Sequence, residues 1–361
     1  MDIKINFLNF SHVHVECEDG IFYELRDYFS FEAENYRFNP KFKQGVWDGR
    51  IRLLDYNRKL PYGLVNQIKK FADQFGYSFW IDPQITEKEE ISREEFDKWV
   101  ESKEIYSGNT RITPHWYQSD AVYEGLVNRR KILNLPTSAG KSLIQALLAR
   151  YYLENYEGKV LILVPTTALV DQMINDFVDY RLFPREACLG IRSGTKRDSD
   201  AMIYVSTYQT AVKQPKEWFE QFGQFMNDEC HMATGKSIST VIEGLTNCMF
   251  KFGLSGSLRD GKANLMQYMG LFGELPYVHP LPVRNSAYIW CGWWVMDEIQ
   301  KMTLAGQDWK TDDPDSPYYL HRYTLQKMIT DYPEVDVQES RNGRVIHRTA
   351  LEAGIIYDYV Y

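Results

Sequence analysis

The residues best suited to chemistry lie in one short segment, 133–142, where an apolar run ends in Gly140-Lys141-Ser142. Helical spacing of apolar residues follows, so the segment predicts a strand, a tight turn and the start of a helix. Amide groups at a helix N-terminus point at a bound anion, and the helix dipole favours its charge. A lysine in such a turn contacts the β- and γ-phosphates, and a serine hydroxyl can bind Mg²⁺. Lys141 and Ser142 are therefore candidate residues of a phosphate site.

This segment departs from the strict phosphate-loop pattern, which requires glycine where the chain has Leu135. A second Gly-Lys-Ser tripeptide occurs at 235–237. It follows an acidic, polar stretch with no strand before it, and we interpret it as an ordinary loop. The first tripeptide therefore needs independent support from the rest of the chain.

A pair of adjacent carboxylates supplies this support. Asp228 and Glu229 directly follow an apolar strand candidate. The first can hold Mg²⁺ opposite Ser142, and the second can orient and deprotonate an attacking water molecule. A phosphate cradle, a metal ion and a positioned water are together what phosphoryl transfer requires. We therefore predict Lys141, Asp228 and Glu229 as catalytic residues, and Ser142 and Asp228 as metal ligands.

Apolar strands that alternate with helices must position these groups. The strand candidates between about 110 and 278 are 132–135, 160–164, 202–205, 224–227 and 249–254. Buried strands that alternate with helices predict an α/β fold with a doubly wound parallel sheet. Polar clusters follow these strands at the carboxyl edge, where open α/β sheets bind their ligands.

The first part of the chain differs in pattern. Residues 1–82 are expected to form a small α+β nucleic-acid-binding domain, and 83–110 a charged linker with a capping box at Ser92 and Glu95. In the small domain, cations stand among aromatic residues, and Asp48-Gly49 predicts a hairpin turn. The candidates for contact with nucleic acid are Lys41, Lys43, Trp47, Arg50 and Arg52. The alternative is a solvated strand face with Trp47 in the domain core.

Composition limits the class of protein. A chain of 361 residues with a net charge of −8 predicts two or three domains. No apolar run approaches the roughly 20 residues that span a bilayer, and the N-terminus lacks the plan of a signal peptide. The five cysteines are scattered without a CxxC pair, which favours a reduced cytoplasmic setting and no zinc site. The acidic balance excludes a basic coat but permits local basic patches.

The ordered motifs resemble those of superfamily 2 helicases of the DExH type, over residues 1 to about 278. Segment 136–142 is similar to motif I, whose family form often lacks the first glycine. Segments 164–169, 205–208, 228–231 and 254–259 are similar to motifs Ia, Ib, II and III. The resemblance implies a RecA-like ATP-binding lobe at 111–278, with ATP and Mg²⁺ as cofactors. The nucleotide-binding residues that it implies are Gln118, Pro136, Thr137, Ser138, Ala139, Gly140, Lys141, Ser142 and His231.

The same resemblance implies DNA as the partner. Pro165, Thr166 and Thr207 would contact the backbone of a DNA strand. The basic hairpin resembles that of a phage-encoded member of the family. This implies an ATP-dependent helicase or translocase acting on branched DNA and R-loops in phage recombination, repair and replication. The alternatives are another DExH ATPase, such as an RNA helicase or a restriction-type translocase, and a nucleic-acid-binding module without motor activity.

Residues 279–361 do not resemble the second lobe that such a motor uses, which needs roughly 150 residues. A candidate arginine-finger segment at 338–348 has the wrong spacing, and Asn342-Gly343 predicts a hairpin turn instead. We expect this tail to be a separate small unit of fused, foreign or variant origin. Its tryptophans, Trp290, Trp293 and Trp294, form either a partner surface or the core of that unit.

Overall fold

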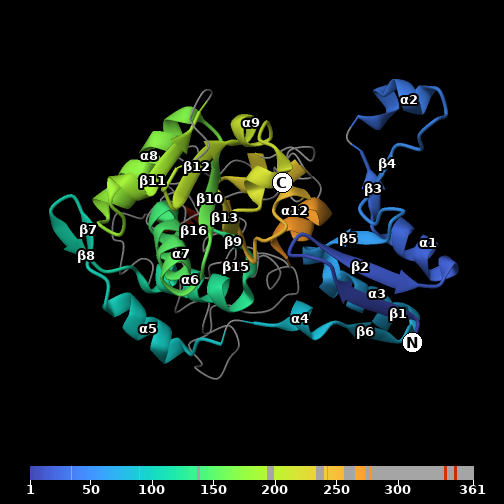
Figure 1. Ribbon diagram of the computed structural model, residues 1–361, viewed down its shortest axis with the longest axis horizontal. Helices are drawn as coiled ribbons and strands as arrows, with labels where there is room; N and C mark the ends of the chain where they lie inside the picture. The colour runs from blue at the N-terminus through green and yellow to red at the C-terminus, as the bar shows by residue number, and fades with distance from the viewer. Residues whose placement is uncertain are drawn as a thin grey trace. The chain divides into compact units, whose positions relative to one another are not determined.

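The computed structural model is a chain of two units, residues 1–135 with 140–279, and residues 136–139 with 280–361 (Figure 1). It describes residues 1–33, 35–88, 90–135, 139–192, 199–232, 240–241, 243–255, 265–273, 277–278, 337–339 and 345–347. In the second unit, β16 (Val337–Glu339) pairs antiparallel with β17 (Val345–His347). These strands flank the predicted Asn342-Gly343 turn, which itself lies outside the described residues.

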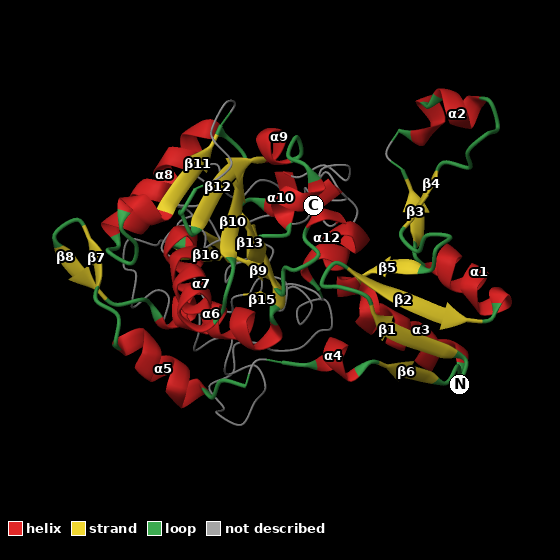
Figure 2. Ribbon diagram, viewed as in Figure 1, coloured by secondary structure: helices red, strands yellow, loops and turns green. Residues whose placement is uncertain are grey.

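A parallel sheet forms the centre of the first unit and confirms the predicted α/β fold. Among the described residues it has seven strands, in the order β11-β12-β10-β13-β14-β9-β15 (Figure 2). They are β9 (Arg130–Asn134), β10 (Lys159–Val164), β11 (Cys188–Ile191), β12 (Ile203–Thr207), β13 (Phe222–Asn227), β14 (Phe250–Ser255) and β15 (Tyr277–Val278). The short strands β11 and β15 were not among those expected from the sequence.

Helices cover both faces of this sheet. Successive strand residues point to opposite sides, and the central strands are buried on both sides, so each face packs against helices. On one face lie α6 (Trp116–Asn128), α7 (Lys141–Asn155) and α8 (Thr167–Asp179). On the other lie α9 (Tyr208–Ala211), α10 (Lys216–Phe219) and α12 (Leu265–Phe272). Leu161 and Leu163 share a buried cluster with Phe219 and Phe272 on this second face. None of the described helices is both long and apolar enough to span a bilayer.

The N-terminal domain is a small α+β structure, as predicted. Its sheet has the order β5-β2-β1-β6. Its elements are β1 (Ile3–Phe7), β2 (His12–Cys17), α1 (Asp19–Tyr28), β5 (Lys59–Pro61), η2 (Tyr62–Leu64), α3 (Val65–Phe75) and β6 (Phe79–Ile81). Alternation along β1 and β2 buries Ile3, Ile5, Val13 and Val15 in one core with α1 and α3.

The hairpin turn predicted at Asp48-Gly49 is wrong. Strand β4 (Arg50–Arg52) pairs with β3 (Ser30–Glu32), so the two paired strands are joined by a long loop. This loop carries η1 (Tyr36–Phe38) and α2 (Pro40–Lys43). A capping side chain at Asn39 and a proline at the first helical position begin α2. Gly49 adopts φ +81° at the end of the loop, and its carbonyl accepts a bond from the Ala33 amide.

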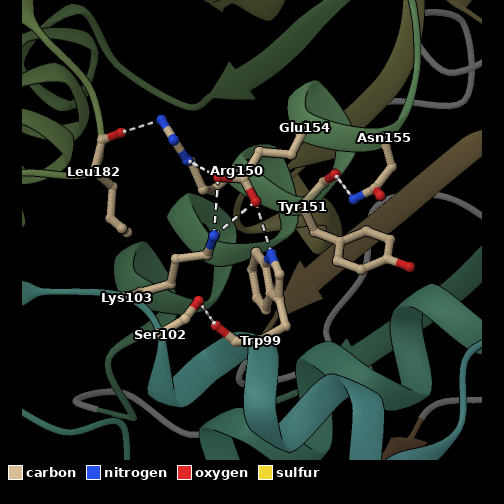
Figure 3. A network of polar contacts seen from close by, with 8 residues as sticks. All are labelled: Trp99, Ser102, Lys103, Arg150, Tyr151, Glu154, Asn155 and Leu182. Carbon is tan, nitrogen blue, oxygen red and sulfur yellow. Dashed lines mark hydrogen bonds and ion pairs between the residues drawn. The ribbon is translucent and has the colours of Figure 1, made fainter.

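The segment expected to be a charged linker contains ordered elements: α4 (Pro83–Thr86), α5 (Arg93–Glu101), β7 (Ile105–Ser107) and β8 (Thr110–Ile112). The predicted capping box of Ser92 and Glu95 opens α5. Trp99, on α5, donates through Nε1 to Glu154 of α7 at 2.7 Å. Lys103, two residues after α5, pairs with the same carboxylate at 2.7 Å (Figure 3). Helix α5 is therefore attached to α7, the helix that begins at Lys141, by a polar network.

A buried lysine joins the N-terminal domain to the parallel sheet. The Lys251 ammonium group, on β14, donates to the carbonyls of Phe10 and Leu245 at 2.8 and 3.1 Å and to Ser11 Oγ at 3.3 Å. Arg130 donates to the same Phe10 carbonyl and lies over the Tyr62 ring. Burial lowers the pKa of Lys251 well below its usual range. The β1–β2 loop is thus held against β9 and β14 by buried cations.

Candidate active site

Two of the predicted catalytic residues meet at the carboxyl edge of the sheet. Helix α7 begins at Lys141, directly after Gly140 at φ +72°, and Glu229 follows β13. The Lys141 ammonium group forms an ion pair with the Glu229 carboxylate. Glu229 itself has φ +47°, a left-handed conformation that costs about 1–3 kcal/mol in a residue with a side chain. Backbone strain at this turn therefore coincides with the predicted position of the catalytic base.

Asp228 is buried next to this pair, with 8% of its surface exposed. Its amide donates to the Leu163 carbonyl at 2.8 Å, and Gln145 Nε2 donates to its carboxylate at 3.2 Å. Burial raises the pKa of Asp228 from 3.8 to about 6, although the positive charge of Lys141 opposes the shift. The positive charge near the Asp228 carboxylate does not offset the effect of its burial, and a bound metal ion would supply the missing charge.

The Ser142 hydroxyl lies 2.8 Å from the hydroxyl of Tyr180, the residue after α8. Asp176, one turn earlier on α8, also hydrogen-bonds Ser142, and burial raises the pKa of its carboxyl. Sequence reasoning missed both residues. The spacing of 176 and 180 places them on one face of a helix, but no motif marks that face. Only the packing of α8 against α7 brings them to Ser142.

Gln118 lies beside the phosphate-loop glycine. Its side chain is nearly buried and accepts a bond from the His115 amide at 2.8 Å. A Cβ at Gly140 would stand 2.2 Å from Gln118 Nε2, so glycine alone permits this approach. The structure therefore places Gln118, one of the predicted nucleotide-binding residues, next to Gly140 of the predicted phosphate loop.

The remaining residues of the predicted nucleotide site are covered only in part. Ala139 is buried. Pro136, Thr137 and Ser138 lie outside the described residues. The backbone of His231 belongs to η4 (Cys230–Met232), but its side chain is outside the described part of the chain. Their predicted roles stay predictions.

The residues that are present fit a magnesium nucleotide. Ser142 and Asp228 offer a hydroxyl and a carboxylate, the hard oxygen donors that Mg²⁺ takes alongside phosphate oxygens and water. The buried Gln145 Oε1 has no hydrogen-bond partner among the described residues, and a hydrated ion would supply one. In the part of the chain that the structure describes, no group of three or more His, Cys, Asp or Glu residues is arranged to hold a metal ion by itself.

The predicted DNA-contacting residues of the β3–β4 ribbon divide into two groups. Trp47 Nε1 donates to the Arg50 carbonyl at 2.9 Å, and Arg50 Nε donates to Ser30 Oγ at 3.0 Å. Arg52 pairs with Asp48 and, as its main hydrogen-bond partner, lowers the pKa of that carboxyl to about 2. Lys41 and Lys43 are exposed on α2. The tryptophan and arginines thus hold the ribbon together, whereas the lysines face solvent.

The strand-end residues predicted to contact DNA lie at the ends of neighbouring strands. Thr166 is exposed and caps α8 through the Leu169 amide at 3.4 Å, and Pro165 beside it is half-buried. Thr207 ends β12 and is buried, with its hydroxyl 3.1 Å from that of Thr210. Since β10 and β12 pair in parallel, these positions share the carboxyl edge.

Two family models match separate parts of the chain. The family "DNA helicase UvsW, N-terminal" matches residues 2–82, and the family "Type III restriction enzyme, res subunit" matches residues 111–260. The first match covers the small α+β domain, and the second covers the residues of the phosphate loop and the Asp228-Glu229 pair.

One curated relative of this chain is a capsid protein rather than a helicase. Over 87 residues, 24% of the chain, the sequence is 85% identical to the highly immunogenic outer capsid protein of Enterobacteria phage T4, of which it covers 23%. Outside the two family matches, only the residues after 260 form a stretch long enough for this match. The expected origin of the tail, as a fused, foreign or variant segment, stays a prediction.

A curated relative, the ATP-dependent DNA helicase UvsW of Enterobacteria phage T4, matches at 71% identity over 279 residues. The match includes 76% of this chain, but the chain spans only 56% of that helicase. A crystal structure of T4 UvsW matches with a TM-score of 0.73 and 71% identity, over 76% of this chain and 99% of the crystallised one. From the phosphate loop, the carboxylate pair, the parallel sheet and these matches, we conclude that the chain belongs to the UvsW family of superfamily 2 helicases.

Proposed function

We propose that the chain is the ATP-binding part of an ATP-dependent superfamily 2 DNA helicase or translocase. The observation that carries this proposal is the direct pairing of Lys141 with Glu229 beside the buried Asp228. A lysine that binds phosphate and a carboxylate that activates water must face the same reacting group. Their contact across 88 residues of sequence places both at one point of the sheet edge.

Each residue has a role in this proposal. Lys141 neutralises the β- and γ-phosphates of ATP, and nucleotide entry separates it from Glu229. Ser142 and Asp228 hold Mg²⁺, which when bound supplies charge to stabilise the transferring phosphoryl group. Glu229, released from Lys141, orients the attacking water and takes its proton. Gln118 contacts the adenine base, and His231 couples the nucleotide site to the Ser255 strand end.

The proposed domain organisation follows the sequence boundaries. Residues 1–82 form an accessory nucleic-acid-binding domain, 83–110 a connecting segment, 111–278 the ATP-binding lobe and 279–361 a small additional unit. The exposed Lys41 and Lys43, with the strand-end residues Pro165 and Thr166, support DNA as the partner. Branched DNA and R-loops are the proposed substrates, in phage recombination, repair and replication within the host cytoplasm.

Other assignments remain distinct hypotheses. The match to a restriction-enzyme subunit family favours a duplex translocase of the restriction type as the second candidate. An RNA helicase would differ in preferring RNA as the stimulating strand. Because the chain spans only 56% of T4 UvsW, a binding module without motor activity is a further candidate, and we expect the chain alone to turn ATP over slowly or not at all.

Nucleotide binding tests the proposed site directly. We expect the full chain to bind a fluorescent ATP analogue in the presence of Mg²⁺ and Lys141→Ala to lose this binding. Lys236→Ala, in the second Gly-Lys-Ser tripeptide, is the matched control and should bind as the parent does. Equal loss in both variants, or retention in Lys141→Ala, would refute the assignment of the phosphate loop.

Hydrolysis tests the substrate class. ATP turnover should be compared with no nucleic acid, duplex DNA, forked DNA and RNA. Stimulation by RNA above DNA would overturn the DNA assignment. Rapid DNA-stimulated turnover that Lys141→Ala abolishes would contradict the expected weak activity of this chain while supporting the site.

A further inference from the structure

The loop between β3 and β4 is a projecting arm with an ordered tip, residues 35–49 (Figure 1). Asn39 Oδ1 accepts from the Lys41 amide at 3.0 Å and begins α2. The rings of Tyr36 and Phe42 meet edge to face at 4.8 Å. A Cβ at Gly49 would stand 2.3 Å from the Tyr36 ring, so the ring lies directly on the glycine backbone. Tyr36 and Phe42, both half-buried, thus form a ring pair that holds the tip in shape.

Phe38 does not belong to the Tyr36–Phe42 ring pair. It is 74% exposed, the largest fraction for an aromatic side chain among the described residues. Tyr56, the next most exposed at 71%, is covered on one ring face by the Arg26 guanidinium at 3.9 Å. Phe38 has no such ring contact in the described part of the chain, and Val46 near the other end of the tip is also 74% exposed. The tip therefore orders its backbone while presenting an aromatic ring to solvent.

Cations surround this ring in the sequence. Arg37, Lys41 and Lys43 are exposed, and residues 35–47 contain no acidic side chain. Asp48, the nearest acid after them, is paired with Arg52. In a chain with a net charge of −8, the tip is a local positive patch. An acidic phosphate backbone would be drawn to this patch.

An exposed aromatic ring among cations matches the chemistry of unpaired nucleotides. Cations neutralise the phosphates, and a ring stacks on a base whose face is free. Within a duplex both faces of a base are already stacked, so this contact requires an unpaired base or an opened step. The projecting position of the arm suits a point where strands separate (Figure 1).

We propose that Phe38 stacks on the unpaired base next to a duplex end and so makes the arm a reader of DNA branch points. This inference deepens the proposed function and rests on it for the DNA itself. Lys41 and Lys43 supply affinity for any DNA, whereas Phe38 supplies preference for the branch. Phe38 is thus a specificity-determining residue, and it takes no part in ATP hydrolysis.

Binding of the full chain to two DNA ligands tests this division. The ligands are a forked duplex, with 2-aminopurine at the first unpaired position, and a blunt duplex of the same length. We expect Phe38→Ala to weaken binding to the fork roughly tenfold and to leave blunt-duplex binding within about twofold. The parent should quench 2-aminopurine by stacking, Phe38→Ala should not, and Phe38→Trp should restore the quenching.

Two controls separate this inference from the proposed DNA role. Phe75→Ala removes an aromatic ring that is 53% exposed on α3, outside the arm, and should change neither affinity. Lys41→Ala with Lys43→Ala should weaken binding to both ligands. If the lysine variant weakens binding while Phe38→Ala leaves the fork preference intact, the Phe38 inference is wrong and the DNA role stands. If neither variant alters binding, the arm is no DNA site, and a protein partner becomes the alternative occupant.

Discussion

Removing the buried charge at Asp228 should stabilise the protein while destroying its metal site. The perturbation is Asp228→Asn, which keeps the size of the side chain and the bond from Gln145. Lys141 retains its ion pair with Glu229, so the substitution leaves no buried cation without a partner. The variant therefore isolates the cost of holding an ionised carboxylate in this position.

The magnitude follows from the pKa. Burial raises the pKa of Asp228 from 3.8 to about 6, and a shift of about two units corresponds to about 3 kcal/mol. Because the folded-state pKa is the higher one, the folded protein binds the proton more tightly than the unfolded chain. This stabilisation is fully present below about pH 3.8 and is lost as the pH rises through about 6. Above that range, the ionised group costs about 3 kcal/mol that asparagine does not.

Urea and thermal unfolding of the full chain between pH 4 and 8 measure this difference. The advantage of Asp228→Asn should grow from near zero at pH 4 to about 3 kcal/mol at pH 8, or roughly 5 °C in the unfolding midpoint. Asp73→Asn, at an exposed carboxylate on α3, is the control and should show no such growth. Mg²⁺ with nucleotide should stabilise the parent more than Asp228→Asn. A variant that is less stable than the parent at pH 8, or a difference that does not vary with pH, would refute this account of Asp228.

The remaining predictions concern four other places in the chain. Lys251→Met removes one donor each from Phe10, Ser11 and Leu245, although Arg130 still donates to the Phe10 carbonyl and Ser11 to the Leu245 carbonyl; we expect about 1–3 kcal/mol loss of stability in urea unfolding, and an unchanged midpoint would contradict this. Tyr180→Phe removes the partner of Ser142 and should weaken Mg²⁺-dependent nucleotide binding roughly threefold to tenfold, whereas binding without Mg²⁺ should not change. Lys41→Glu with Lys43→Glu should weaken DNA binding and reduce the salt slope by about 2; an unchanged slope would remove these lysines from the DNA surface. Charge reversal at Arg50 and Arg52, which also bond Ser30 and Asp48, should weaken DNA binding and flatten its salt slope, and Trp47 fluorescence would report any loosening of the ribbon; unchanged DNA binding would remove these arginines from the DNA surface.

Much of the fold could be predicted from the sequence because its signals are local. The apolar strands that end at Leu135, Val164 and Asn227 are each followed by polar residues, and a parallel sheet necessarily gathers such strand ends at one edge. The expected alternation of strands and helices is present, and so is the capping box at Ser92 and Glu95. Local patterns failed at Asp48-Gly49, because Arg50–Arg52 pairs with the distant strand Ser30–Glu32 instead of forming a tight hairpin.

By itself, the sequence determined which residue types are available at each strand end and therefore the class of chemistry. Tertiary structure decided which of them meet, because contacts between distant segments depend on strand order and helix packing rather than on spacing. It formed the ion pair between Lys141 and Glu229 and the hydrogen bond between Tyr180 and Ser142, and it buried Lys251 against the β1–β2 loop. It also gave the half-buried Arg50 and Arg52 partners at Ser30 and Asp48 and left Phe38 exposed. No sequence periodicity distinguishes a side chain that bonds within the fold from one that stays exposed, since burial is a property of the whole fold.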